Sequence, residues 1–176
     1  MRKDSKLLEM LAGYAAAHQH PLNIAVHLVG IPTIMLGVFI PLTWVSFEIG
    51  GITIDLAQVV LVAMFGFYLT LDVPFAVVFL VASYFIALLA AYLGDLPSGT
   101  AITIASAAFF GGYLAQFIGH AVERSVPVIL RHPVQANLAA PFFTVVEVCK
   151  LLGLRESLFN EVQEKIASMR REEADA

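Results

Sequence analysis

Four long apolar runs are the feature that most limits how this chain can fold. They cover about residues 24–46, 52–71, 74–93 and 100–119. Each run approaches the ~20 residues that a helix needs to cross a bilayer, and none shows the alternation typical of a barrel strand. The 176-residue chain is 59% hydrophobic and only 14% charged, far from the composition of a soluble domain. The sequence therefore predicts an all-α, multi-pass membrane helix bundle with four transmembrane helices.

The segments outside these runs are expected to belong to the same domain. An amphipathic N-terminal helix is predicted over about residues 1–20, and a polar C-terminal helix that frays into solvent over 160–176. Residues 126–156 are apolar but contain three prolines, which interrupt a straight span, so we expect an interfacial or re-entrant segment there. The sequence thus predicts a single membrane-embedded domain over 1–176, in which residues 24–119 hold the four transmembrane helices.

The charged residues predict sidedness and exclude some classes of function. All ten Lys and Arg residues lie in the first six positions or from Arg124 onward. By the positive-inside rule, both termini should face the cytoplasm, in a bacterial inner membrane or, in a eukaryote, the endoplasmic reticulum. A net charge of −4 with scattered basic residues is not typical of a nucleic-acid-binding protein. The single cysteine, Cys149, excludes an intramolecular disulfide and a Cys-rich metal site.

A first polar cluster precedes and begins the first apolar run. It consists of Tyr14, His18, His20, Asn23 and His27. On one straight helix, His18 and His27 would lie on opposite faces, because nine residues separate them. Pro21 is expected to end one helix near His18–His20 and to begin another, and this break can turn His18 back towards His27. Asn23 lies one turn before His27 on the same face, where it can orient that ligand or a substrate.

A second polar cluster ends the fourth apolar run. It consists of Tyr113, Gln116, His120, Glu123 and Arg124. Gln116, His120 and Glu123 follow the spacing i, i+4, i+7, so they form one stripe, and a polar stripe on a membrane helix must face the bundle interior. We therefore expect the two clusters to meet.

The meeting of several imidazoles predicts a metal site, with hydrogen bonding across helices as the structural alternative. Imidazole nitrogens with at most one carboxylate suit iron, zinc or copper. His20 is the least compelling ligand, because it directly precedes a proline. His132, between Arg131 and Pro133, is a candidate fourth ligand or an interfacial side chain.

Two sequence blocks carry a resemblance to a known family. They are Tyr14-x3-His18-x4-Asn23-x3-His27-x2-Gly30-Ile31-Pro32 and Gln116-Phe117-x-Gly119-His120-x2-Glu123-x3-Pro127, and the similarity continues through Gln135, Pro141-Phe142-Phe143 and Glu147. In these blocks, over about residues 4–150, the chain resembles the membrane-bound 2-hydroxy fatty acid dioxygenases, whose fungal member acts in phytosphingosine breakdown. The His120–Pro127 interval is one residue shorter than in the eukaryotic pattern, and His132 stands where an asparagine is expected.

The resemblance implies a reaction, a cofactor and a set of site residues. The reaction would be the Fe(II)- and O2-dependent cleavage between C1 and C2 of a 2-hydroxy fatty acid, which gives a fatty acid one carbon shorter in fatty acid α-oxidation. The resemblance implies His18, His27 and His120 as the Fe(2+) ligands. It also implies that Asn23, Gln116 and Glu123 orient the ligands or the substrate, with Glu123 as acceptor of the hydroxyl proton, and that the acyl tail extends between the helices.

Two other classes of function remain open at this stage. A zinc-dependent membrane lipid hydrolase would use the same ligands without O2. A non-enzymatic transporter or scaffold would need polar residues through the middle of the bilayer, and the central parts of the four runs contain few.

The distribution of basic residues gives a first testable prediction. Reporters fused to either end of the chain should both report a cytoplasmic location, because residues 7–123 contain no Lys or Arg. Protease protection that places the two ends on opposite sides of the membrane would contradict this topology.

Overall fold

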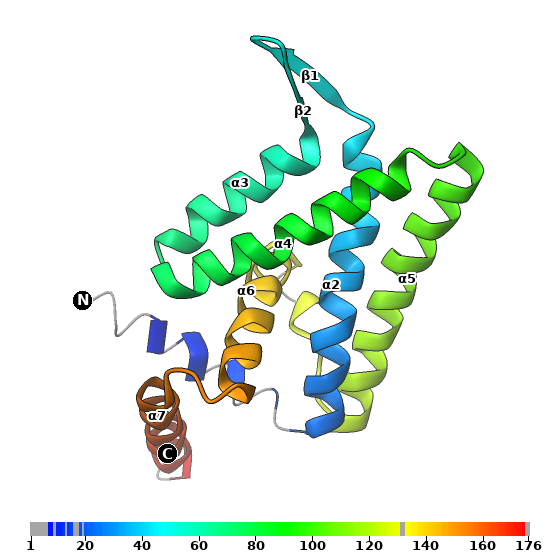
Figure 1. Cartoon of the computed structure of the whole chain (residues 1–176). Helices are drawn as coiled ribbons and strands as arrows, with labels where there is room; N and C mark the ends of the chain where they lie inside the picture. The colour runs from blue at the N-terminus through cyan, green and yellow to red at the C-terminus, as the bar shows by residue number, and fades with distance from the viewer. Residues whose placement is uncertain are drawn as a thin grey trace.

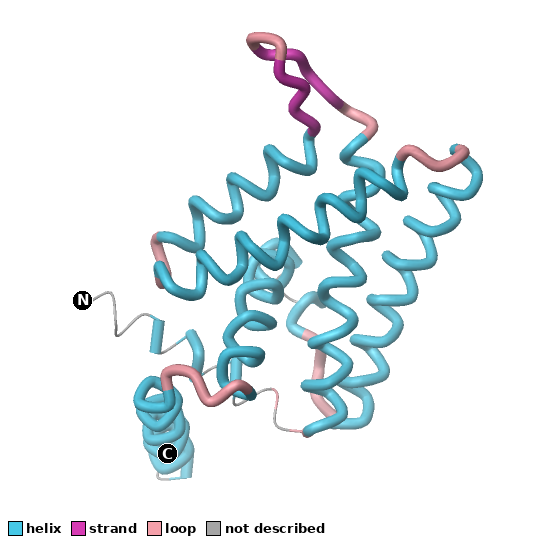
Figure 2. The backbone as a smooth tube through the Cα atoms, viewed as in Figure 1, coloured by secondary structure: helices cyan, strands magenta, loops and turns pink. Residues whose placement is uncertain are grey.

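The computed structural model describes residues 7–8, 10–12, 14–15, 18, 20–130 and 133–174 as an all-α bundle with one small β-hairpin (Figures 1 and 2). In chain order the elements are α2 (Pro21–Thr43), β1 (Ser46–Ile49), β2 (Ile52–Asp55), α3 (Leu56–Leu69), α4 (Val73–Gly94), α5 (Ser98–Glu123), the 3-10 helix η1 (Val128–Leu130), α6 (Pro133–Leu151) and α7 (Glu156–Ala174). The predicted all-α membrane bundle is confirmed. The helix predicted over residues 1–20 falls largely outside the described residues.

Within the described residues, three helices are long and apolar enough to cross a membrane: α2, α4 and α5, with 23, 22 and 26 residues. They correspond to the first, third and fourth predicted spans. A fourth crossing is available only if α6 and α7, which meet at a bend of 113°, act as one broken span. The side of the membrane on which each terminus lies stays a prediction.

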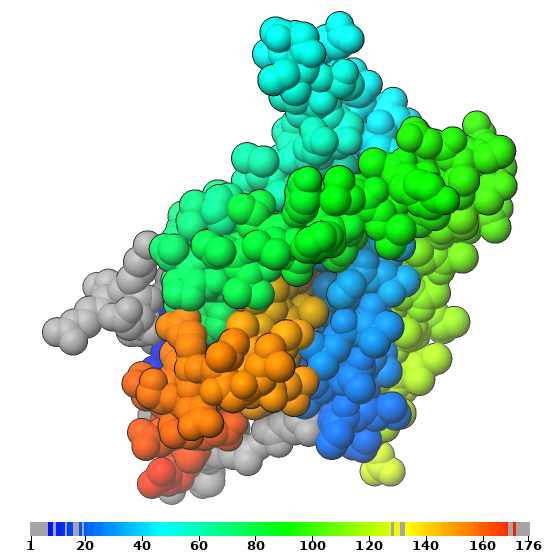
Figure 3. Space-filling view, viewed as in Figure 1, coloured from blue at the N-terminus to red at the C-terminus, as the bar shows by residue number. Residues whose placement is uncertain are grey.

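The prediction of a single membrane-length helix over 52–71, the second predicted span, is wrong. Its first residues form β2, which pairs with β1 in an antiparallel hairpin around Gly50 and Gly51, both at positive φ. A capping box then starts α3, because Gln58 N donates to the Asp55 carboxylate and Asp55 N donates to the Gln58 side chain. The remaining helix has 14 residues, about 21 Å at 1.5 Å per residue, which is shorter than the ~30 Å hydrocarbon core. The hairpin projects beyond the helices (Figure 3).

Helix α7 covers most of the segment predicted as a polar tail, and its first half packs on the protein. Val162 and Ile166 of α7 are buried in the hydrophobic core, so this helix packs on the protein. Before it, Arg155 donates two 2.7 Å hydrogen bonds to the carboxylate of Asp72, at the turn between α3 and α4. The guanidinium also lies 4.5 Å from the centre of the Phe75 ring. This contact fixes the corner between α6 and α7 to the α3–α4 hairpin.

Helix α2 has its most extensive contact with α5, and the two lie side by side in Figure 1. Glycine makes this approach possible. A Cβ atom added to Gly37 of α2 would lie 2.6 Å from Phe109 N and 2.9 Å from Ala105 O, both backbone atoms of α5. Backbone atoms cannot move aside as a flexible side chain can. Small residues at such contacts are typical of membrane helix pairs, because they let the backbones approach closely.

This packing predicts opposite effects for two Gly→Ala changes. Gly37→Ala should lower stability by about 1–3 kcal/mol, because the new methyl group overpacks the contact between α2 and α5. Gly111→Ala, on α5 with nothing within 4 Å of its added Cβ, should be neutral or stabilising through helix propensity. Thermal unfolding of both variants in one detergent measures the difference. Equal melting temperatures would show that α2 and α5 are not in close contact.

Candidate metal centre

Three histidines meet at one end of the bundle, between the start of α2 and the end of α5. His18, His27 and His120 are buried, at 6%, 8% and 5% exposure. Their ring centroids lie 4.7 Å (His18 to His27), 5.2 Å (His18 to His120) and 5.1 Å (His27 to His120) apart. One nitrogen from each ring lies within 4.8 Å of the other two. The two polar clusters found in the sequence therefore come together.

The backbone around Pro21 explains how His18 reaches this position. Pro21 is the first residue of α2, and His20 before it is extended, at φ −75° and ψ 125°. The side chain of His20 caps the helix, because its Nδ1 accepts a hydrogen bond from Leu22 N at 3.2 Å. The chain direction changes at this point, so His18 and His27 do not lie on one continuous helix. His18 is therefore free of the helical spacing that would place it on the face opposite His27.

Hydrogen bonds fix the orientation of the imidazoles and leave one nitrogen of each ring available. His18 Nδ1 donates to the Tyr14 carbonyl at 3.0 Å, and His27 Nδ1 donates to the Asn23 carbonyl at 2.9 Å. A carbonyl can only accept, so Nδ1 carries the proton in both rings and Nε2 keeps its lone pair. His120 Nδ1 is hydrogen-bonded to Ser125 Oγ at 2.8 Å. Such partners orient metal-bound histidines in proteins.

Burial keeps His18 neutral. Desolvation lowers its pKa below the ordinary 6.5, against smaller raising effects of the Tyr14 carbonyl, Glu123 and Glu147. The group is therefore unprotonated at neutral pH and its Nε2 can bind a metal ion. Protonation of a ligand histidine competes with metal binding, so acid should favour release of the ion.

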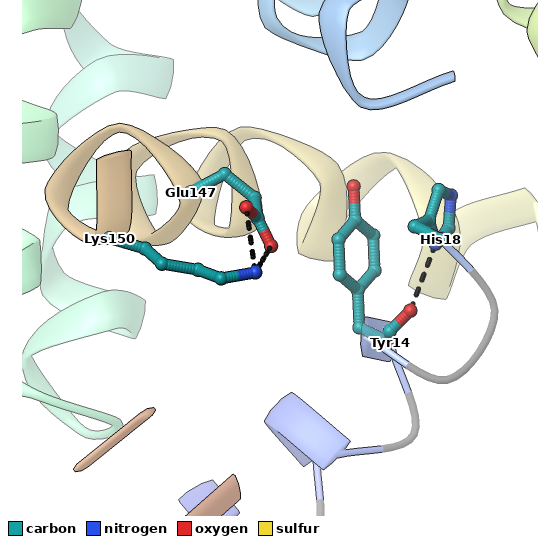
Figure 4. A network of polar contacts seen from close by, with 4 residues as sticks. All are labelled: Tyr14, His18, Glu147 and Lys150. Carbon is teal, nitrogen blue, oxygen red and sulfur yellow. Dashed lines mark hydrogen bonds and ion pairs between the residues drawn. The ribbon is translucent and has the colours of Figure 1, made fainter. Parts of the chain in front are cut away.

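The ring of Tyr14 packs against the face of the His18 ring. The two rings stack at a centroid distance of 4.0 Å, and Tyr14 also stacks on Phe143 of α6 at 3.8 Å. Figure 4 shows Tyr14 between His18 and the ion pair of Glu147 with Lys150. Burial, with smaller effects of Glu147 and Glu123, raises the pKa of the Tyr14 phenol, which stays neutral. Aromatic packing thus limits the movement of His18.

Glu123 joins the two polar clusters at the residues that precede and begin α2. Its Oε1 accepts a hydrogen bond from His20 N at 3.0 Å, and its Oε2 accepts one from Asn23 Nδ2. Asn23 is fully buried, and its Oδ1 lies against Gly119 of α5. Neither Glu123 nor Asn23 is among the described residues that line the cavity beside the histidines. These contacts place the carboxylate where it holds the start of α2 to the end of α5.

The other described residues of the two clusters make separate contacts. His20 is exposed and caps α2. Arg124 is exposed and ends α5 in the left-handed conformation, at φ 56°. Tyr113 donates a 2.6 Å hydrogen bond to Asn137 Oδ1 of α6. His132 lies outside the described residues, so its ligation stays a prediction.

A cavity of about 910 Å³ extends from the histidines into the bundle. Its wall includes His18, His27, His120 and Gln116 together with mostly apolar residues of α2, α3, α5 and α6, among them Ile31, Met35, Phe39, Met64, Phe117 and Phe142. A volume of this size is typical of a site for a small organic ligand. Thr70, Tyr113, Gln135 and Asn137 add further polar groups, but most of the wall is apolar and suited to an apolar chain.

Three features of the site were not predicted from the sequence. They are the hydrogen bond between His120 and Ser125, the stacking of Tyr14 on Phe143, and the contribution of α6 to the cavity wall. Ser125 is the only one with a local signal, since it is a hydroxyl residue just beyond the helix that carries His120. The other two depend on the tertiary packing of α6.

A family profile described as 2-hydroxy-palmitic acid dioxygenase Mpo1-like matches residues 5–152. The chain belongs to the Mpo1-like family. The matched range contains every residue of both polar clusters and ends just before α7. No curated protein and no solved structure matches the chain. The resemblance inferred from the two sequence blocks is therefore confirmed at the level of the family.

The side chains of this Mpo1-like protein fit a metal ion. Three buried imidazoles have ligand nitrogens close together, and two of the three rings have their protons assigned to the opposite nitrogen by carbonyl acceptors. Imidazole donors suit iron, zinc and copper. A metal ion between the rings would bind one nitrogen of each imidazole at once.

Replacing any one of the three histidines should remove the metal. His18→Ala, His27→Ala and His120→Ala should each lower bound metal at least about tenfold, because two imidazoles cannot hold the ion in this geometry. His20→Ala is the matched control. It removes only a helix cap and should keep the metal at a stability cost of about 0.5–2 kcal/mol. Elemental analysis of the purified variants measures this, and loss of metal from His20→Ala with retention in His18→Ala would contradict the assignment.

Proposed function

We propose that this protein is an Fe(II)-dependent dioxygenase that cleaves the bond between C1 and C2 of 2-hydroxy fatty acids and releases fatty acids one carbon shorter. The observation that carries the proposal is the position of three buried histidines in the wall of a large, mostly apolar cavity. Membership of a family described by a 2-hydroxy-palmitic acid dioxygenase supports the choice of substrate and reaction.

In this proposal the ligands are His18, His27 and His120, held in place by their Nδ1 hydrogen bonds. Bound Fe(II) would supply the site at which O2 reacts and a Lewis acid for the carboxylate and hydroxyl of the substrate. The stack of Phe143, Tyr14 and His18 restricts the one ligand that does not lie on a long helix. Preorganised ligands of this kind need little rearrangement when the ion and the substrate bind.

The cavity would hold the acyl tail. Its wall follows α2 from His27 to Phe39, which is about 18 Å at 1.5 Å per residue, with α3 and α6 opposite. Relative to a tail in water, burial of each methylene group in such a wall is favourable by about 0.8 kcal/mol. The same apolar surface excludes water from the reacting end, which protects reactive oxygen chemistry from side reactions.

Glu123 and Asn23 would position the site. The carboxylate is already hydrogen-bonded to His20 N and to Asn23, so its contacts favour a role in holding α2 and α5 together over acceptance of the hydroxyl proton. Asn23 in turn provides the backbone carbonyl that orients His27. Movement of this pair would displace two of the three ligand histidines.

The proposed reaction predicts a dependence on hydroxyl, metal and oxygen. Purified protein loaded with Fe(II) in air should convert 2-hydroxyhexadecanoate to pentadecanoate, and a chelator or removal of O2 should abolish the product. Hexadecanoate, which lacks one of the two chelating oxygens, should react poorly.

Mass spectrometry of the products decides between this reaction and hydrolysis. A product that retains all carbons of the substrate, or turnover of a lipid ester with zinc in the absence of O2, would contradict the dioxygenase and favour a zinc-dependent hydrolase.

A further inference from the structure

Gln116 has a buried side-chain amide with neither of its polar atoms hydrogen-bonded within the described residues. Both Nε2 and Oε1 are shielded from solvent. A buried donor or acceptor without a partner is unfavourable by about 1–3 kcal/mol. Such groups are rare in folded proteins, and each calls for a physical explanation. A ligand that offers both an acceptor and a donor would satisfy this amide.

The packing of Gln116 places its amide close to the histidines, on the cavity wall. Gln116 lies one turn before His120 on α5 and lines the same cavity. Its amide packs against Gly30, one turn after His27 on α2. A Cβ atom added to Gly30 would come within 2.5 Å of Gln116 Nε2. Since one helical turn is about 5.4 Å, the amide is about one turn further into the cavity than the proposed metal ligands.

Asn23 shows by contrast why Gln116 is the better candidate to contact a ligand. Asn23 Oδ1 is also buried without a hydrogen-bond partner. However, Asn23 Nδ2 donates to Glu123, and Oδ1 faces Gly119. Asn23 is not among the described residues that line the cavity, whereas Gln116 is. Gln116 is therefore the unsatisfied amide whose side chain lines the cavity, and a rotation of that side chain would present the amide to a molecule bound there.

We propose that Gln116 recognises the head group of a 2-hydroxy fatty acid, with its NH2 group donating to the carboxylate and its carbonyl oxygen accepting from the 2-hydroxyl. This inference rests on the proposed function and adds a determinant of specificity to it. A fatty acid without the hydroxyl group leaves the amide oxygen unsatisfied. Sites that hydrogen-bond a substrate hydroxyl discriminate strongly against the analogue that lacks it.

Binding measurements on the Gln116→Met variant test the proposal, because methionine has a similar length and no amide. The Fe(II)-loaded protein is kept without O2, so that binding is not followed by turnover. Affinities for 2-hydroxyhexadecanoate and hexadecanoate come from displacement of a fluorescent fatty acid, and iron content is measured in the same samples. Gln135→Met is the matched control, since Gln135 also lines the cavity but is exposed.

The preference of the wild type for the hydroxy acid should fall at least about fivefold in Gln116→Met, with iron content and affinity for hexadecanoate retained. Gln135→Met should keep the wild-type preference. Gly30→Ala, which displaces the amide without removing it, should reduce the preference as Gln116→Met does.

Other results would overturn the assignment. An unchanged preference in Gln116→Met, an equal loss of affinity for both acids, or a loss of iron would show that the amide is structural. These outcomes are distinct from failure of the proposed function, in which the wild type itself forms no shortened acid from 2-hydroxyhexadecanoate in air. If the wild type is active while Gln116→Met keeps its preference, only the role of Gln116 is rejected.

Discussion

The close contact between α2 and α5 is the constraint on which the rest of the structure depends. Each helix contributes one histidine and one half of the hydrogen-bonded pair of Asn23 and Glu123. The glycines at this contact allow an approach that a single methyl group would prevent. In a bilayer, the hydrophobic effect contributes little to the association of two helices, so close packing and a few buried polar contacts must stabilise the pair. The position of the candidate metal site is thus a consequence of helix packing along most of α2.

The polar groups at this end of the bundle surround the three imidazoles in successive layers of hydrogen bonds. Backbone carbonyls and Ser125 hold the outer nitrogen of each imidazole, while the inner nitrogens face one another. Glu123 does not contact the rings through these bonds but accepts hydrogen bonds from the backbone of His20 and the side chain of Asn23. Among the described residues, Asn23 Oδ1 and both amide atoms of Gln116 are buried without a hydrogen-bond partner, so Gln116 is the residue whose whole amide is unsatisfied.

Local chemistry explains which parts of this arrangement were predictable. Proline restricts its own backbone and that of the residue before it, so the break at Pro21 could be inferred from the sequence. Helical spacing placed Gln116 and His120 on one face. Hydropathy wrongly predicted helix at residues 52–55, because a short β-branched segment next to an apolar helix cannot be told from a longer helix by hydropathy alone. Gly50-Gly51 did indicate a turn. The stack of Tyr14 on Phe143 and the cavity itself depend on contacts between distant segments, which periodicity cannot predict.

The hydrogen bond between Asn23 and Glu123 joins residues that are 100 positions apart in the chain. During synthesis, the first polar cluster therefore emerges long before its partner on α5 exists. Contacts between residues so distant in sequence form late in folding, because the loop between them must be closed first. The ion can be captured by all three histidines only after the last of the long apolar helices is in place. Metal uptake would then follow the pairing of α2 with α5, so a newly made chain could not assemble its candidate metal centre before these two distant helices have met.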